Sequence, residues 1–261
     1  RREWEGLGRL MVRLIGSEHV EVRAVAEAHL APLGFERLWN GWEGMTREQR
    51  ERVGMALMKI DRRFLEKLDG KMAAGESGER VRGIQVVRHL GQETYFESRL
   101  VGLSEDGDER VAATAVRALG GMGASAAAEA ALGRALSHRD DRVRSNAIEG
   151  LEALKRLGEH GEALERISRG DGHRSRATAI RALLSMPLSE GLPALVRMLD
   201  EGDERHRISA LWVVERMELV GVLDRVATLA KGDGDSRVRS RAVRVIRDMV
   251  ERARSTQREV G

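Results

Sequence analysis

Apolar residues recur along the chain at the spacing of an α-helix, interrupted by short acidic and glycine-rich stretches. The segment DDRVRSNAIEGL at residues 140–151 shows the pattern. We count from Arg144 as position 0. Ala147 then stands at +3, Ile148 at +4 and Leu151 at +7. These positions share one face of a helix with 3.6 residues per turn, so the segment predicts an amphipathic helix that buries this face against a neighbour.

The same pattern recurs eight times, which predicts a repeat protein. Position +3 is Ala in seven units and Val86 in the remaining one, and position +7 is always Leu, Ile or Val. Upstream of each position 0 lies a second apolar segment, such as LPALVRML at 192–199. Two such helices cannot bury their apolar faces alone, so hairpins of this kind stack on one another. Position 0 falls 29 to 32 residues apart, at Arg23, Val53, Gly83, Ala112, Arg144, Arg176, Arg207 and Arg239.

The predicted fold is an all-α solenoid of about eight helical hairpins, which form one repeat domain over residues 1–261. Clusters such as KGDGDS separate the paired helices, and their Asp or Ser residues are placed to cap the second helix. Glycines follow several predicted helix ends, where a left-handed backbone is common: Gly34, Gly91, Gly120 and Gly158. The second helices are expected near residues 18–33, 46–60, 77–90, 107–119, 139–154, 171–185, 202–218 and 234–252.

The repeat has a recognisable consensus. The run acid-x-Arg-Val-Arg-x-x-Ala-x-x-x-Leu, as in DDRVRSNAIEGL and GDSRVRSRAVRVI, resembles the short HEAT-like repeats of phycobilin lyases and of many bacterial scaffold proteins. The resemblance covers nearly the whole chain and is weaker before residue 78. It implies a right-handed superhelix in which the second helix of each pair lines the concave side. It does not imply lyase chemistry, because a fold of this kind serves unrelated functions.

The composition argues against several kinds of functional site. The 45 basic residues nearly balance the 42 acidic ones, so the protein as a whole is not a polycation. Without Cys there is no disulfide and no thiolate ligand or nucleophile, and the seven His residues form no HExxH motif. We therefore expect no cofactor and no metal site. No apolar run approaches the roughly 20 residues of a membrane-spanning helix. The chain starts at Arg1 within a predicted helix, so we expect a monomer or part of a longer chain, in the cytoplasm by default.

Arginines at position 0 are predicted to be structural. They fall on the packed face of the second helix, and a buried guanidinium needs a carboxylate partner. An acid stands just upstream in each case, Glu21 for the first. The resemblance to HEAT-like repeats implies that these residues form a ladder between successive units. The predicted ladder residues are Arg23, Asp141, Arg144, Asp171, Arg176, Asp203, Arg207, Asp235 and Arg239.

Arginines at positions −2 and +5 point to the opposite face, which the resemblance places in the concave groove. Trp212 shares this register and would offer an aromatic anchor of the kind enriched in binding hot spots. Acids such as Glu109 and Glu204 stand beside these arginines, so a self-neutralised, solvated face is the alternative to a binding stripe. The candidate partner-binding residues are Arg88, Arg110, Arg117, Arg142, Arg174, Arg181, Arg205, Trp212, Arg237 and Arg244.

Three functions remain open at this point. The leading hypothesis is a non-catalytic scaffold that holds a protein or an acidic peptide in its groove. The alternative is a nucleic-acid-binding protein similar to the HEAT-like alkylpurine DNA glycosylases. The near-neutral charge and the lack of interleaved aromatic residues count against it. A chromophore-lyase or chaperone-like role rests on the repeat type alone. No GxSxG nucleophile motif occurs, so the sequence does not predict an enzyme.

Overall fold

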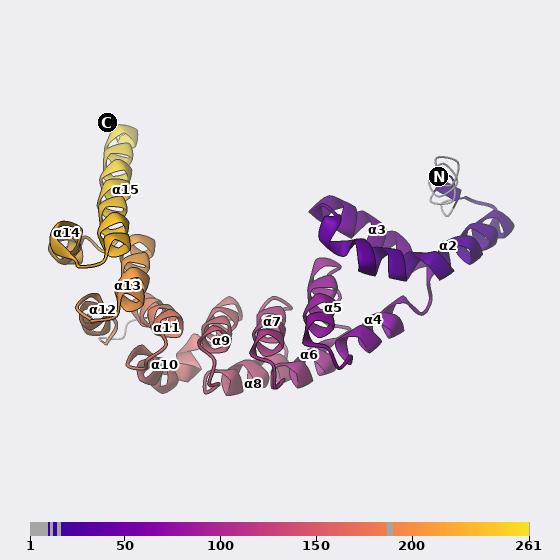
Figure 1. The fold of residues 1–261 in the computed structure, drawn as a ribbon, viewed down its shortest axis with the longest axis horizontal. Helices are drawn as coiled ribbons and strands as arrows, with labels where there is room; N and C mark the ends of the chain where they lie inside the picture. The colour runs from indigo at the N-terminus through magenta and orange to yellow at the C-terminus, as the bar shows by residue number, and fades with distance from the viewer. Residues whose placement is uncertain (1–9, 11–12, 15–16, 187–189, 261) are drawn as a thin grey trace. The chain divides into compact units, whose positions relative to one another are not determined.

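The computed structural model describes residues 10, 13–14, 17–186 and 190–260. All regular secondary structure within these ranges is helical, which confirms the all-α fold class (Figure 1). The chain groups into two compact units, residues 1–103 and 104–261, each considered separately below. The outermost residues of the predicted repeat domain, 1–9 and 261, lie outside the described residues. None of the described helices is long and apolar enough to cross a membrane.

The first unit is built around aromatic residues at the end of its first described helix. Phe35 contacts Phe64 edge to face at 5.4 Å between ring centroids, and Trp42 is 2% exposed. Trp39 and Trp42 of the segment LWNGWEGM are therefore buried. Its elements are α2 (Val20–Gly41), η1 (Trp42–Gly44), α3 (Arg47–Ile60), α4 (Phe64–Met72), α5 (Ser77–His89) and α6 (Glu97–Leu103).

Helix α2 continues to Gly41, beyond the end expected at residue 33. Gly34 therefore lies inside the helix, and it does not form the predicted left-handed end. A Cβ atom on Gly34 would lie 2.1 Å from Leu57 Cδ2, so the residue allows α3 to pack closely. Of the four glycines predicted at helix ends, only Gly91 has a positive φ, +64°.

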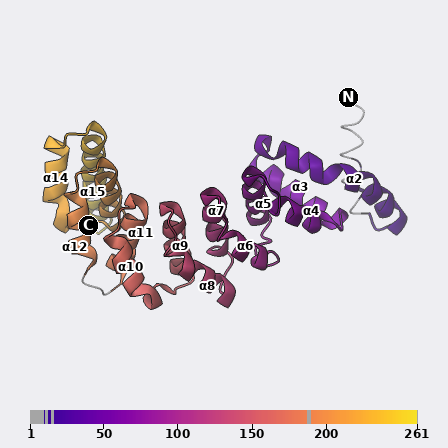
Figure 2. The same ribbon diagram turned by 60° about the horizontal axis from the view of Figure 1, so that its bottom comes forward.

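The second unit consists of two layers of helices that alternate along the chain (Figures 1 and 2). Its second-helix layer contains α7 (Glu109–Leu119), α9 (Asp141–Ala153), α11 (His173–Ser185), α13 (Glu204–Met217) and α15 (Ser236–Val260). Consecutive members of this layer pack side by side. The other layer contains α8 (Ala126–Ala135), α10 (Gly161–Ser168), α12 (Gly191–Leu199) and α14 (Leu223–Gly232), joined by the short helices η2 (Leu157–His160) and η3 (Val220–Val222).

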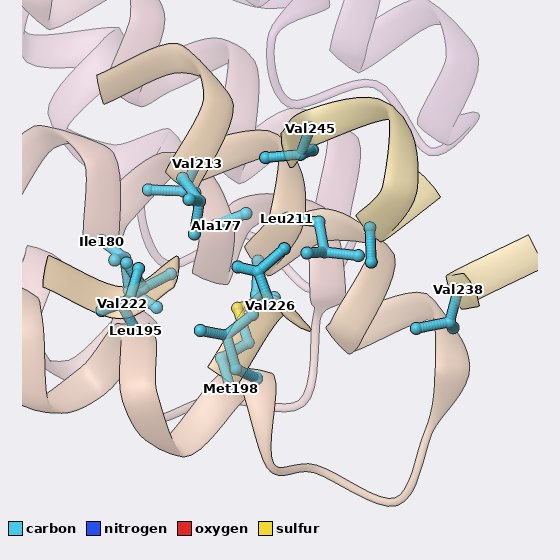
Figure 3. Packing of buried hydrophobic residues seen from close by; sticks show 14 of the residues in the cluster. Ala177, Ile180, Leu195, Met198, Leu211, Val213, Val222, Val226, Val238 and Val245 are labelled. Atoms are coloured by element: carbon cyan, nitrogen blue, oxygen red, sulfur yellow. The ribbon is translucent and has the colours of Figure 1, made fainter. Parts of the chain in front are cut away.

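The periodic apolar positions form the core of this unit. The five alanines at +3 are fully buried, as in Ala147 and Ala210, and Leu119, Leu151 and Leu183 at +7 are buried with them. Small residues at +3 let neighbouring helices approach, and the larger residues fill the remaining space. Figure 3 shows the part of this core where side chains from α11, α12, α13, α14 and α15 converge.

The last helix of the second-helix layer, α15, departs from this pattern. Val243 occupies position +4 of α15 but is 53% exposed. In the earlier helices of the unit the +4 residue is covered, as for Leu211, which is fully buried. Among the described residues, no helix lies against this side of α15.

In the second unit, aspartates cap the second helices as expected, with one exception. Asp108, Asp140 and Asp203 each accept backbone N–H groups at the first turn of the helix that follows. Helix α11 is preceded by Gly172, which has no capping side chain. Its cap comes from the preceding repeat, because Asp141 of α9 accepts the N–H of Arg174 at 3.0 Å and that of Ser175 at 2.9 Å.

The missing side chain at Gly172 makes this arrangement possible. A Cβ there would lie 2.1 Å from Asp141 Oδ1 and 2.4 Å from Arg144 Nη2. Burial disfavours the charged form of Asp141, but hydrogen bonds from Ser175 and Arg174 and the nearby Arg144 charge outweigh it. The pKa of Asp141 is therefore held below its ordinary value.

We expect Asp141→Asn to lower the free energy of unfolding at pH 7 by about 1–2 kcal/mol, because it weakens charge-assisted bonds to otherwise unpaired N–H groups. The folded-state pKa is depressed, so this stabilisation is present above the unfolded pKa of about 3.9 and is lost as the pH falls through the folded value. Urea denaturation of both proteins at several pH values measures the difference, which should shrink below about pH 4.

Asp171→Asn is the matched control, because Asp171 is exposed and accepts a bond only through its backbone oxygen. It should change stability by less than about 0.5 kcal/mol. A pH-independent loss in Asp141→Asn would contradict the assigned role of the carboxylate.

Candidate partner-binding surface

The second helices of the second unit run parallel and in register. Ser145 at +1 of α9 bonds Thr178 at +2 of α11, with 2.9 Å between the hydroxyl oxygens. Arg237 at −2 of α15 donates to Glu204 at −3 of α13, at 3.0 Å. Because these bonds join nearly equal repeat positions, residues at one repeat position form a row across the layer.

Four of the five arginines at position 0 bind the loop that precedes their own helix. Arg144 Nη1 donates to the carbonyl oxygens of His138 and Arg139 at 2.7 and 2.8 Å. These carbonyls would otherwise lack a partner at the helix-to-helix turn, so the guanidinium fixes the turn. The same pair of bonds, to carbonyls six and five residues upstream, is made by Arg23, Arg207 and Arg239.

The acids expected to pair with these arginines bind other groups in most units. Asp203 and Asp235 cap helices, and Asp171 uses only its backbone oxygen. Asp141 does lie beside Arg144, at 3.4 Å. In other units the arginine pairs with an acid from the loop before the next second helix. Glu201 lies 3.0 Å from Arg176, and Asp233 makes two bonds to Arg207. The reason is that a carboxylate at the helix start satisfies unpaired N–H groups first.

Arginines at −2 form a continuous row on the exposed face, hereafter the arginine row. Each is the second residue of its helix, and all five side chains are exposed. Within the described residues, no ion pair is recorded for the first four. Arg237 is neutralised, because it pairs with Asp235 and Glu204. Its hydrogen bond to Asp235 lowers the pKa of that carboxyl to about 2. The row comprises Arg110, Arg142, Arg174, Arg205 and Arg237.

The acids that stand beside the arginine row bind across the repeats. Glu109 pairs with Arg139 at 3.1 Å, in the loop before the next second helix. Asp141 caps α11, and Glu204 pairs with Arg237 of α15. These carboxylates therefore hold neighbouring repeats together and leave the guanidinium groups of Arg110, Arg142 and Arg205 without an ion-pair partner among the described residues.

The +5 positions form a less continuous row. Arg117 and Arg244 are exposed, and no described residue forms an ion pair with them. Glu149 interrupts the row, and Arg181 is half-buried and paired with Glu152 of α9. The remaining two candidates are Trp212, which is 36% exposed on α13, and Arg88, which is exposed on α5 of the first unit.

Two histidines join α11 and the loop before it to α13. His173 Nδ1 lies 3.0 Å from Ser209 Oγ, and His206 Nε2 donates to Asp171 O at 3.1 Å. The two imidazole rings meet edge to face at 6.2 Å between centroids. Sequence reasoning missed this contact, although His173 and His206 stand at −3 and −1 of successive repeats. Among the described residues no group of three or more His, Asp or Glu side chains gathers as a metal site.

The first unit contains a polar cavity of about 570 Å³. Arg47, Arg50, Glu51 and His89 are among its lining residues, beside the buried Trp42. Arg50 lies over the Trp42 ring at 4.8 Å and donates to the Trp42 carbonyl. Burial, followed by the Arg50 charge, lowers the pKa of His89, so the imidazole is neutral at pH 7.

No curated protein matches this sequence. The similar solved structures include the following three. The complex of CpcE and CpcF of phycocyanin lyase from Nostoc sp. PCC7120 has a TM-score of 0.47 at 15% identity, covering 92% of this chain and 86% of that chain. A computationally designed armadillo repeat protein for modular peptide recognition has a TM-score of 0.34 at 17% identity, with coverages of 91% and 98%. Human deoxyhypusine hydroxylase has a TM-score of 0.37 at 17% identity, with coverages of 95% and 97%.

The family assignment itself rests on the sequence. The HEAT-repeat family pattern matches residues 96–173 and 162–247, which together cover more than half of the chain. The matched region includes the second helices from α7 to α13 and most of the apolar part of α15. This chain therefore belongs to the HEAT-repeat family, as its repeat consensus predicts.

Proposed function

We propose that the protein is a non-catalytic interaction scaffold that binds an acidic segment of a partner protein on the arginine row. One observation carries the proposal. Four consecutive helices each present an exposed arginine at their second residue, and the acids directly before three of them, Glu109, Asp141 and Glu204, bind the next repeat. The guanidinium donors of Arg110, Arg142, Arg174 and Arg205 are therefore available to a ligand.

The location of these arginines favours an anionic ligand. The start of a helix carries a partial positive charge, so an arginine there is less stable than an acid would be. Four such arginines in adjacent helices reinforce one another and attract carboxylates or phosphates. A guanidinium binds a carboxylate through two parallel hydrogen bonds, which gives the contact a defined geometry.

A protein ligand agrees better with the rest of the surface than a nucleic acid does. Proteins that bind single strands combine basic residues with several stacking aromatic side chains. On this face Trp212 is the one aromatic candidate, and the whole chain carries a net charge of only +3. A single exposed Trp instead suits one apolar contact beside an acidic segment.

The test compares two double variants that remove the same charge from different layers. Arg142→Ala/Arg174→Ala alters the arginine row, and Arg166→Ala/Arg197→Ala alters exposed residues of α10 and α12. We expect the first to weaken binding of a fluorescent oligoglutamate peptide about tenfold and the second to leave it unchanged. The loss corresponds to about 1.4 kcal/mol, or half of that for each contact. Fluorescence anisotropy at two salt concentrations measures both affinities.

Two outcomes would contradict the proposal. Equal losses in the two double variants would mean that only net charge matters and that the row is not a site. Tighter binding of a DNA oligonucleotide than of oligoglutamate with equal charge, lost in Arg142→Ala/Arg174→Ala, would support the nucleic-acid alternative.

A further inference from the structure

The arginine row has a regular spacing that a ligand would have to match. Axes of packed helices lie about 8–10 Å apart. The helices α7, α9, α11 and α13 pack consecutively and in register, so one guanidinium follows another at about this distance. Bonds between repeats keep the spacing constant. Asn146 of α9 donates to the Ala113 carbonyl of α7 at 2.8 Å, and Asp141 of α9 caps α11.

An extended peptide advances about 3.3–3.6 Å per residue, and a polyproline-type segment about 3.1 Å. A polyproline-type segment has three residues per turn, so every third side chain points to the same face, about 9 Å along the segment, which matches one step of the row. In a fully extended strand, side chains three residues apart point to opposite faces. Two residues cover about 7 Å and four about 14 Å, so both spacings lose register within a few repeats.

A bound helix fits this face less well than an extended segment. Helical ligands dock through apolar residues at i, i+3, i+4 and i+7, which need a hydrophobic groove. Around the arginine row the exposed and half-buried neighbours are polar, such as Thr114, Glu149 and Ser209. Trp212 and the half-buried Ile208 are the exceptions, and two apolar side chains cannot serve four apolar contacts.

We propose that the arginine row recognises the spacing of acidic residues and selects a segment in the polyproline-type conformation with a carboxylate at every third position. Four carboxylates, at i, i+3, i+6 and i+9, pair with Arg110, Arg142, Arg174 and Arg205. The site ends at α15, because Asp235 and Glu204 already neutralise Arg237. This inference rests on the proposed function and adds the pattern that the partner must carry.

The experiment uses the full chain and four peptides of equal length, each with four Glu residues among Gly and Ser. The glutamates stand at every second, third or fourth position, or in one block. We expect the peptide with the spacing of three to bind about tenfold more tightly than the block peptide and about threefold more tightly than the other two. Long arginine side chains can shift to reach a glutamate that lies slightly out of register, which limits the expected difference in affinity to this range.

A double-mutant cycle tests the assignment of individual contacts. Glu→Gln at the second glutamate of the three-spaced peptide should weaken binding to the unaltered chain but not to Arg142→Ala. Against Arg197→Ala, a control on α12, the same peptide change should cost as much as against the unaltered chain. If the peptide change cost as much against Arg142→Ala as against the unaltered chain, the pairing of the second glutamate with Arg142 would be wrong.

The two levels of the proposal fail in different ways. Equal affinities for all four peptides, still lost in Arg142→Ala/Arg174→Ala, would remove the spacing inference and leave the acidic-segment scaffold standing. No binding of any peptide would remove the proposed function itself.

Discussion

Replacing Arg207 by Leu is expected to lower the free energy of unfolding by about 3–5 kcal/mol, because it leaves a buried carboxylate without its partner. Arg207 Nε and Nη2 donate to the two oxygens of Asp233 at 2.7 and 3.0 Å, and the Asp233 side chain is 4% exposed. The same guanidinium holds the carbonyls of Glu201 and Gly202. One side chain thus joins two loops from successive repeats. Urea denaturation followed by circular dichroism measures the loss.

The control stands two residues away on the same helix. Arg205 is exposed, and it has no recorded ion pair among the described residues. Arg205→Leu should change stability by less than about 0.5 kcal/mol, whereas it should weaken binding of an acidic peptide. Arg207→Leu should instead cause a large loss of stability. Equal stability losses in the two variants would mean that the two arginines do not have separate roles.

A compensating replacement separates the buried charge from the packing. Arg207→Leu/Asp233→Leu removes both charges, and substitution of a buried ion pair by apolar residues is often neutral. We expect the double variant to recover most of the stability lost in Arg207→Leu. Failure to recover would assign the loss to the carbonyl bonds of Glu201 and Gly202.

The helical period was sufficient to predict the fold class and much of the core. Ala147, Leu151 and Leu183 are buried where the pattern put them, because burial of one helix face depends on the local spacing of apolar residues. Val243 fits the same pattern yet is exposed. The period records which face is apolar, and it carries no information on whether another helix lies against that face.

Ion-pair partners were beyond the reach of the sequence. Several acids stand within a few residues of Arg207, and the sequence does not distinguish Asp203, which caps α13, from Asp233, which binds the guanidinium. Asp233 lies 26 residues away along the chain. Which acid pairs with Arg207 depends on the distance between the side chains in the folded protein. It also depends on the unpaired N–H groups at the helix start, which compete with the arginine for a nearby carboxylate.

The candidate surface likewise has features that the sequence predicts and features that it does not. The spacing predicts that Arg142 and Arg174 share one side of their helices. It cannot predict whether their neighbouring acids neutralise them. That depends on contacts between repeats, such as those of Glu109 with Arg139 and of Asp141 with the start of α11.

Gly120→Ala is expected to destabilise the protein by about 2–3 kcal/mol, although alanine is the better helix former. Gly120 follows α7 with φ −65°, a backbone conformation that alanine adopts freely. The conflict is with the next helix, because a Cβ on Gly120 would lie 2.5 Å from Gly150 Cα of α9. The atom it meets is backbone and cannot rotate away, so α7 and α9 would have to separate. The urea midpoint of unfolding measures this effect.

Gly121→Ala provides the matched control at the adjacent position. There the nearest atoms to a Cβ are the carbonyl oxygens of Ala118 and Arg117, at 3.5 and 3.8 Å, which are ordinary contacts. Gly121→Ala should therefore leave the midpoint nearly unchanged or raise it slightly. Gly150→Ala tests the same contact from the other side, because its Cβ would lie 3.0 Å from Gly120 Cα. If Gly120→Ala and Gly121→Ala behaved alike, the close approach of α7 and α9 would be wrong, and with it the spacing between the first two arginines of the row.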